Sequence, residues 1–348
     1  MLFEQKKSLA GEFAPAGQVS LFAIMKSGMR SGMRAWGQGA VIGMLMSGLA
    51  ACAQTGERQC TVYTSGVMPI INRSGSPVVR AGINGHPVAL IVDTGATVSL
   101  IGTSHVDPLG LEVLGAYGTI QGVGGREFSQ AVKVDSLEMG PSKASNFTVI
   151  AGGKFGSSID GLPIVGLFGN DFLSNYDTII DIPDHVVRLV RTENCPSATP
   201  GWGGKIHTIP VTHSSSDSLK TTLEVKINDH AADATLDTGS ANTLVTRSAA
   251  RRAGVTRAML QQDPVSLTWG VTHDPLKAYH HLFSTFEVGG IVFHNIRLTV
   301  VEDIPEGDVL LGSDFMQHYR LWIERGSKLY VQHDTDIPSD DPDRKSAQ

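Results

Sequence analysis

The chain carries one internal repeat, and no other feature limits its possible folds as strongly. An Asn-x-His turn, six further residues and an Asp-Thr-Gly triplet occur at residues 84–95 and again, 144 positions further on, at residues 228–239. A second block, two hydrophobic residues followed by Gly-x-Asp-Phe, occurs at residues 167–172 and 310–315. Matching blocks in the same order predict two copies of one structural unit within the chain.

Both copies have the sequence pattern of short β-strands. Apolar segments at residues 88–92 and 231–236 lead into the triplets, and the Asn-Gly pair at residues 84–85 is a strong hairpin signal. Closing hairpins are expected at residues 178–190 and 321–331. The 39 glycines, the 16 prolines and an aromatic content of only 6% favour short elements joined by tight turns. We therefore predict an all-β fold with a few short helices.

The two copies and their flanking segments predict the domain organisation. A first lobe is expected over residues 52–195 and a second over residues 206–333, joined by a linker at residues 196–205 that contains proline and glycine. Residues 334–348 are charged, contain two prolines and lack apolar periodicity. A disordered tail is predicted there.

Residues 1–51 are expected to be a leader and not part of the fold. Basic residues precede a short apolar stretch that ends in Leu-Ala-Ala-Cys at Cys52, which resembles the lipobox of bacterial lipoproteins. Because Ala53 follows the cysteine, the resemblance implies a lipid anchor on the periplasmic side of the outer membrane. An ordinary secretory signal is the alternative. The signal begins naturally at Met25, which leaves residues 1–24 open as an over-extended start.

The cysteine count restricts the covalent chemistry of the chain. Three cysteines are too few for a disulfide scaffold or a Cys-rich metal site. With Cys52 lipidated, Cys60 and Cys195 remain as an even pair, and a disulfide between them is a hypothesis. It would join the start of the first lobe to its end.

Charge and histidine content exclude two further classes of function. The formal net charge of −6 provides no basic surplus for a phosphate backbone, so nucleic acid is not expected as a partner. His273, His280 and His281 have no carboxylate partner at ligand spacing, and a solvated loop is expected there in place of a metal site.

The triplets are the candidate chemical centre. Each stands between two apolar segments, where a lone aspartate would be costly to bury, and a pseudo-twofold axis would bring Asp93 and Asp237 together. With the later Gly-x-Asp-Phe block of each copy, these triplets resemble those of aspartic peptidases of the retropepsin type. The resemblance covers residues 61–333 and implies two β-barrel lobes, related by the pseudo-twofold axis, with a cleft between them.

The same resemblance implies a reaction. Two carboxyl groups held close together share one proton, since both cannot ionise easily. The ionised partner of Asp93 and Asp237 would act as general base on a shared water, and the other as general acid, in hydrolysis of a peptide bond. This implies a peptide or protein substrate and requires no metal or cofactor.

Neighbouring residues receive supporting roles from the resemblance. Thr94 and Thr238 would cross-link the two loops through hydroxyl-to-backbone hydrogen bonds. Gly95 and Gly239 would allow close approach of the backbones. Apart from the resemblance, Asp171 and Asp314 of the later blocks follow a glycine and an Asn or Ser, and they are expected to cap short helices.

A hairpin that closes over the cleft is also implied. In the first copy its tip would be the run of Gly122, Val123, Gly124 and Gly125. In the second copy Trp269 and Gly270 stand at a comparable place, but without the cluster of glycines.

The residue after each triplet differs between the copies, Ala96 in the first and Ser240 in the second. A serine hydroxyl that donates to a carboxylate favours its charged form, and alanine has no such donor. Asp237 is therefore predicted to be the more readily ionised partner.

Two alternatives to a monomeric endopeptidase stay open at this point. The same cleft could serve a peptide-binding or envelope scaffold module without catalytic activity. Each half could also pair with the equivalent half of another chain, giving an oligomer in place of a monomer with two pseudo-dimeric lobes.

Overall fold

The computed structural model describes residues 61–140, 142–195, 200–212, 219–270, 275–305, 307–324 and 328–341. All of these belong to one compact unit, residues 57–348. The expected leader, with Cys52, and the predicted disulfide partner Cys60 lie outside the described residues. None of the helices in the described part of the chain is long and apolar enough to cross a membrane.

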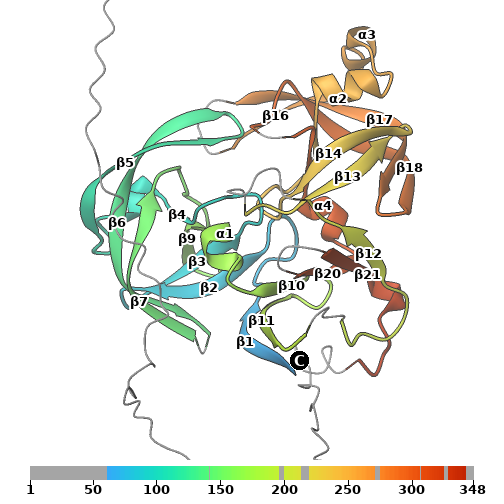
Figure 1. The fold of residues 1–348 in the computed structure, drawn as a ribbon. Coiled ribbons are helices and arrows are strands. Elements are labelled where there is room, and N and C mark those ends of the chain that lie inside the picture. Colours follow the sequence, from blue (N-terminus) through green and yellow to red (C-terminus); the bar gives the residue numbers. More distant parts are fainter. Residues whose placement is uncertain are drawn as a thin grey trace, which may run out of the picture. The chain divides into compact units, whose positions relative to one another are not determined.

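Six strands of the first half close into a barrel (Figure 1). In spatial order they are β2 (Val78–Ile83), β3 (His86–Val92), β9 (Leu162–Phe168), β4 (Leu100–Ile101), β7 (Ser142–Ala151) and β6 (Gly125–Met139). The barrel closes because β2 pairs with both β3 and β6. Strand β5 (Glu112–Gly122) continues the sheet beyond β6, and β8 (Ser158–Ile159) pairs with β9.

The second half repeats this strand order. Its barrel runs β13 (Thr222–Ile227), β14 (His230–Leu236), β19 (Val309–Leu311), β15 (Leu244–Thr246), β18 (Ile291–Val301) and β17 (Leu276–Val288), and closes through the pairing of β13 with β17. Strand β16 (Val265–Thr268) takes the place of β5. Two barrels with one topology confirm the predicted all-β fold of two related lobes.

The tight turns between the first two strands of each barrel have the expected chemistry. Asn84 and Gly85 have φ angles of 49° and 80°, and Asn228 and Asp229 have 47° and 66°. Two successive residues in the left-handed region form the type of hairpin turn that matches strand twist, and Asn, Asp and Gly tolerate it best. The repeated Asn-x-His pattern is therefore a repeated turn.

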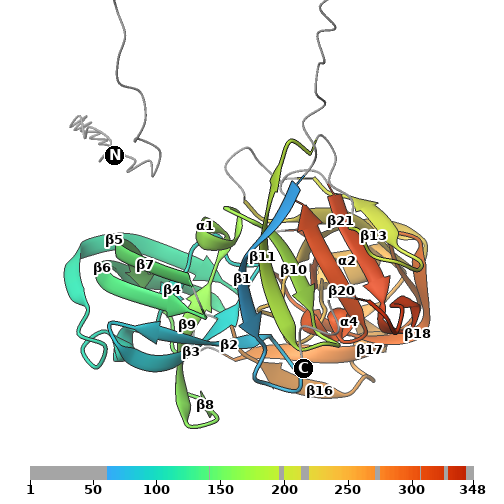
Figure 2. The same cartoon turned by 90° about the horizontal axis from the view of Figure 1, so that it is seen from below.

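A third sheet joins the two halves, and the sequence does not predict it. Its order is β1 (Thr61–Pro69), β11 (Val186–Glu193), β10 (Asp177–Asp181), β20 (Tyr319–Glu324), β21 (Lys328–His333) and β12 (His207–Pro210). The predicted hairpins are present as β10–β11 and β20–β21, but β10 and β20 also pair with each other, so the hairpins form one sheet. In Figure 2 the strands β1, β11, β10, β20 and β21 of this sheet lie side by side.

The helices are all short. They are η1 (Thr103–His105), α1 (Asn170–Leu173), α2 (Arg247–Arg252), α3 (Arg257–Leu260), α4 (Ser313–Met316) and η2 (Asp334–Asp336). Of these, α1, α2 and α4 follow the carboxyl ends of β9, β15 and β19. Thr246 caps α2 by accepting from the amide of Ala249.

The predicted disordered tail is wrong for its first part, residues 334–341. Ile337 and Asp341 are buried, and the Asp341 carboxylate accepts from the guanidinium of Arg320 at 2.7 Å. Trp202, from the expected linker, lies over the same guanidinium, 4.1 Å from its central carbon to the ring centroid. The buried Arg320 guanidinium on β20 therefore binds both the linker and the start of the tail, although the polar composition of these segments predicts no such contact.

Candidate active site

The two triplets begin where β3 and β14 end. The amide of Asp93 donates to the carbonyl of Phe168, and the amide of Asp237 donates to that of Leu311, both at 2.9 Å. In each barrel the partner strand, β9 or β19, runs parallel to the strand that carries the aspartate. Both loops therefore leave their barrels in the same way.

The two loops are cross-linked by their threonines. The Thr94 hydroxyl donates to the carbonyl of Leu236 at 2.7 Å and accepts from the amide of Thr238 at 3.1 Å. The Thr238 hydroxyl donates to the carbonyl of Val92 at 2.5 Å and accepts from the amide of Thr94 at 3.0 Å. These are the hydroxyl-to-backbone bonds that the resemblance implies.

The glycines bring each loop against the aspartate of the other. A Cβ atom on Gly95 would overlap the carboxyl group of Asp237, and one on Gly239 would overlap that of Asp93. The two carboxyl groups also share a hydrogen bond. The structure therefore brings the two predicted residues together, and glycine is required at both contacts.

Backbone amides hold the two carboxylates in place. One oxygen of Asp93 accepts from the amides of Gly95 and Ala96 at 2.9 and 3.0 Å. One oxygen of Asp237 accepts from the amide of Ser240 at 3.0 Å. Ala96 and Ser240, the residues after the triplets, thus bind the carboxylates through their main-chain amides.

The predicted role of the Ser240 hydroxyl is wrong. This hydroxyl donates to the carbonyl of Asn242 at 2.7 Å and so turns back into its own loop. A local bond of a serine side chain to a nearby carbonyl competes with any longer-range partner. The difference between Ala96 and Ser240 therefore does not distinguish the two carboxyl groups.

Both carboxyl groups have raised pKa values, and Asp93 more than Asp237. Burial raises the pKa of Asp93, the negative charge of Asp237 raises it further, and the Gly95 and Ala96 amides offset part of this effect. Burial also raises the pKa of Asp237, but hydrogen bonds from Ser240, Asp93 and Gly239 and the charge of Lys220 lower it. Burial thus favours the protonated form of both carboxyl groups, and the backbone amides oppose it at both.

Two residues missed by the sequence prediction support the loops from behind. The Asn170 amide donates to the carbonyls of Thr94 and Ala96 at 2.7 and 2.9 Å, and the Ser313 hydroxyl donates to that of Thr238 at 2.8 Å. Both stand at the variable position of the repeated Gly-x-Asp-Phe block. A polar residue there in both copies is a signal that could have identified them.

The aspartates of the same block are not the N-cap residues of their helices, which are Gly169 for α1 and Gly312 for α4. Each still accepts from an amide of the first helical turn, Asp171 from that of Phe172 at 2.9 Å and Asp314 from that of Phe315 at 2.8 Å. Asp171 also accepts from the amide and hydroxyl of Ser99, at 2.9 and 2.7 Å, and Asp314 accepts from those of Thr243. Each carboxylate thus ties its helix to the strand that follows the triplet.

The predicted hairpin tip of the first half is present and meets the second half. Gly122 ends β5, Gly125 begins β6, and Val123 and Gly124 form the turn between them. Val123 packs against an apolar cluster of the second barrel, made of Leu244, Ala278, Val301, Ile304 and Leu310. The tip therefore bridges the two lobes.

The second half also has a hairpin, between β16 and β17. Trp269 and Gly270 follow β16, and the Trp269 side chain is 60% exposed. A Cβ on Gly270 would overlap the carbonyl of Val123, so the two hairpins touch at this point. In Figure 1 the free ends of β5 and β16 approach each other above the barrels.

The histidines of the second half do not lie in a solvated loop as expected. His280 and His281 are in β17, where His280 contacts the Ser266 hydroxyl at 2.8 Å and the buried His281 contacts Asp263 at 2.6 Å. His273 lies outside the described residues. Within those residues no group of three or more His, Cys, Asp or Glu side chains could hold a metal ion.

Cys195 is disulfide-bonded, and its partner lies outside the described residues. Pairing with Cys60 stays a prediction.

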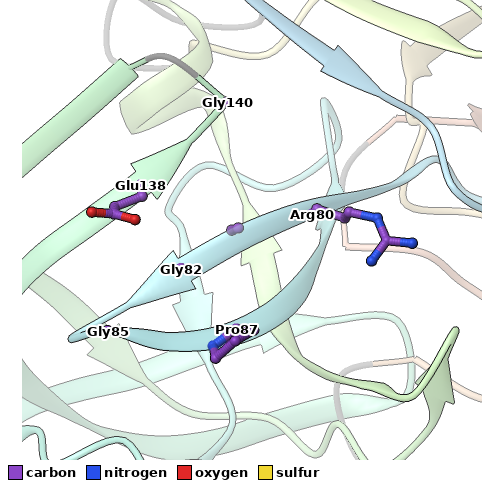
Figure 3. Close-up of a pocket in the computed structure, with 7 residues that line it drawn as sticks. Arg80, Gly82, Gly85, Pro87, Glu138 and Gly140 are labelled. Carbon is purple, nitrogen blue, oxygen red and sulfur yellow. The ribbon is translucent and has the colours of Figure 1, made fainter.

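A surface hollow lies at the far end of β2 and β3 from Asp93 (Figure 3). Its two charged side chains, Arg80 and Glu138, pair with Asp160 and Lys143 at 2.9 and 2.6 Å. The hollow has no contact with the aspartate loops and belongs to a different part of the first barrel.

Sequence models of two protein families match the chain, one in each barrel. Residues 79–172 match the aspartyl protease model, and residues 223–318 match the model for the aspartyl protease of gag polyproteins. The matches together cover more than half of the chain, and each includes one Asp-Thr-Gly triplet. No curated protein matches the chain. Two barrels of one topology, cross-linked triplets and paired family matches lead to one conclusion: the chain belongs to the retropepsin-like aspartyl proteases, with two copies of the family's domain in tandem.

Proposed function

We propose that the protein is an aspartic endopeptidase whose single active site combines Asp93 and Asp237. The observation that carries the proposal is the hydrogen bond between the two carboxyl groups, held across loops that Thr94 and Thr238 cross-link. One protonated and one ionised carboxyl group, at one place and in a fixed orientation, are the groups that general acid and general base catalysis require.

The unequal pKa values support an assignment of the two roles. Asp237, the ionised partner, accepts a proton from a water molecule, and the water oxygen attacks the carbonyl carbon of the peptide bond. Asp93 gives its proton to the carbonyl oxygen, so the tetrahedral intermediate forms without a free oxyanion. Asp237, now protonated, donates its proton to the amide nitrogen, and the carbon–nitrogen bond breaks as a hydroxyl group of the intermediate returns a proton to Asp93. A carboxylic acid and an amine are released.

Cleavage of a diverse peptide library by the wild type, Asp93→Asn and Asp237→Asn tests the proposal. Each variant keeps the size of the side chain but removes one acid–base group, and we expect peptide cleavage to fall by about 10²- to 10⁴-fold. Inhibitors that mimic the tetrahedral intermediate should block the wild type, and chelators should have no effect.

The exposed Asp107 provides the matched control, because Asp107→Asn makes the same change away from the loops. Full activity in either dyad variant would contradict the shared active site. A wild type that binds peptides in the cleft without cleaving them would favour the scaffold alternative.

A further inference from the structure

The pseudo-symmetry of the active site is broken at the residue opposite each aspartate. In the first half the amide of Val92 donates to the carbonyl of Pro77, and in the second half the amide of Leu236 donates to that of Thr221, both at 2.9 Å. One step further along the same antiparallel registers, Ser76 stands opposite Asp93, and Lys220 stands opposite Asp237. A neutral residue in one half is thus replaced by a cation in the other.

Ser76 shows where a side chain at this position reaches. Its hydroxyl donates to the carbonyl of Gly239 at 2.7 Å, so it crosses to the loop of the other half. Lys220 has the equivalent place in the second barrel and is half-buried. Its aliphatic part therefore starts beside the loops, and opposite residues of an antiparallel pair have Cα atoms only about 5 Å apart.

We propose that Lys220 is a positioning residue of the pair: its ammonium group, at the position opposite Asp237 just before β13, selects Asp237 as the base and Asp93 as the acid. The inference rests on the proposed function, in which the ionised carboxyl group is the base and the protonated one is the acid. In place of the Ser240 hydroxyl, Lys220 then distinguishes the two loops.

The other charged groups around the pair do not provide this difference. Asp93 acts on the Asp237 carboxylate through a hydrogen bond, and Lys220 acts on it through its charge. Asp171 and Asp314 stand behind the two loops in equivalent places, each held by the hydroxyl and amide of a neighbouring strand. Arg126, beside the first hairpin tip, donates to Gln121 of the same hairpin.

The attraction between unlike charges gives the direction of the effect. A cation near Asp237 stabilises its ionised form and lowers its pKa, which offsets part of the increase that burial causes. Because the base must be ionised, the acidic limb of the pH–rate profile lies at lower pH with Lys220 than without it. Removal of the charge should therefore reduce activity most at acidic pH.

The test compares Lys220→Met, which keeps most of the aliphatic chain, with Lys220→Arg, which keeps the charge. In Lys220→Met we expect the acidic limb of kcat/KM to move to higher pH, with a loss of roughly tenfold at a pH below the wild-type midpoint and little loss on the plateau. Lys220→Arg should keep the wild-type limb. Lys226→Met is the matched control, since Lys226 in β13 pairs with Glu287 in β17 at 3.1 Å.

A titration of the aspartate carboxyl carbons by ¹³C NMR measures the same change in ionisation without a substrate. The variants Asp93→Asn and Asp237→Asn assign the signals of the two carboxyl groups. If Lys220→Met unfolds, Lys220→Gln takes its place. Folded variants with an unmoved limb and an unmoved titration would overturn the role of Lys220, although the peptidase proposal would stand. A wild type that cleaves no peptide, with a carboxyl titration that moves in Lys220→Met, would overturn the peptidase proposal alone.

Discussion

Thr94 and Thr238 exchange hydrogen bonds across the pseudo-twofold axis, each hydroxyl accepting from the amide of the other residue at 3.0 to 3.1 Å. Both residues are buried, with exposed fractions of 2% and 0%. The two aspartate loops are thus positioned by each other, and neither loop has its full set of hydrogen bonds alone.

Loss of one hydroxyl should destabilise the protein strongly. Thr94→Val leaves the carbonyl of Leu236 and the amide of Thr238 without their buried partner, and each unpaired group costs about 1–3 kcal/mol. We expect the free energy of unfolding to fall by about 2–5 kcal/mol, measured by urea denaturation. Thr94→Ser keeps the hydroxyl and is the control. Equal stability of the two variants would refute the cross-link as a source of stability.

The Ser240 hydroxyl should not affect the ionisation of Asp237. Because the main-chain amide, and not the hydroxyl, bonds the carboxylate, Ser240→Ala keeps that bond and loses only the bond to Asn242. We expect the acidic limb of kcat/KM to stay in place and the free energy of unfolding to fall by about 1 kcal/mol. A limb displaced to higher pH would restore the role that the sequence alone predicted for the hydroxyl.

Contact between the hairpins should depend on a glycine. A Cβ on Gly270 would overlap the Val123 carbonyl, so Gly270→Ala must separate the two tips. We expect weaker closure over a bound peptide, seen as a several-fold higher KM with little change in the thermal unfolding midpoint. Gly156→Ala, whose Cβ would meet no atom within 4 Å, is the control. An unchanged KM would show that the contact does not contribute to substrate binding.

The end of the described chain should contribute to stability. Asp341→Ala leaves the Arg320 guanidinium buried without its carboxylate, and loss of one partner of a buried ion pair costs about 3–5 kcal/mol. Denaturant unfolding should show a decrease of this size. Asp340→Ala, at the exposed neighbouring residue, should change the stability by less than about 0.5 kcal/mol. Equal effects would mean that the pair contributes nothing.

Asp181 should make stability depend on pH. Burial, then the charge of Asp184, raises its pKa from 3.8 to about 6. A raised pKa in the folded state favours folding while the group is protonated, so this contribution is complete below pH 3.8 and is lost as pH rises through about 6. The pKa difference corresponds to up to about 3 kcal/mol.

Asp181→Asn cannot titrate and provides the comparison. Between pH 4 and 6 we expect the wild type to lose stability relative to this variant, measured by denaturant unfolding at each pH. Parallel stability curves for the two proteins over this range would contradict the assignment.

Much of the fold could be predicted from local patterns. Short stretches of sequence predict the Asn-x-His turns, the apolar strands before each triplet and the glycine tip at residues 122–125. They do so because turn chemistry and strand alternation depend on near neighbours in the chain. The repeat also predicts a contact between residues far apart in the sequence, since two copies of one unit imply a symmetric pair of loops. The pairing of Asp93 with Asp237 could therefore be predicted from the sequence.

Contacts between distant segments could not be predicted in this way. The pairing of β10 with β20, the support of the loops by Asn170 and Ser313, and the ion pair of Arg320 with Asp341 join residues from different parts of the chain. No short pattern encodes such partners, because a polar side chain is equally compatible with solvent and with a buried bond.

The sequence by itself determined that this protein is a tandem of two similar β-lobes, each bringing one Asp-Thr-Gly triplet. Only the tertiary structure decided how the copies differ, with the Ser240 hydroxyl turned into its own loop and the strand register placing Lys220 opposite Asp237. The physical reason is that pKa values and hydrogen-bond partners depend on burial and on distances across the interface, which residue order alone does not specify.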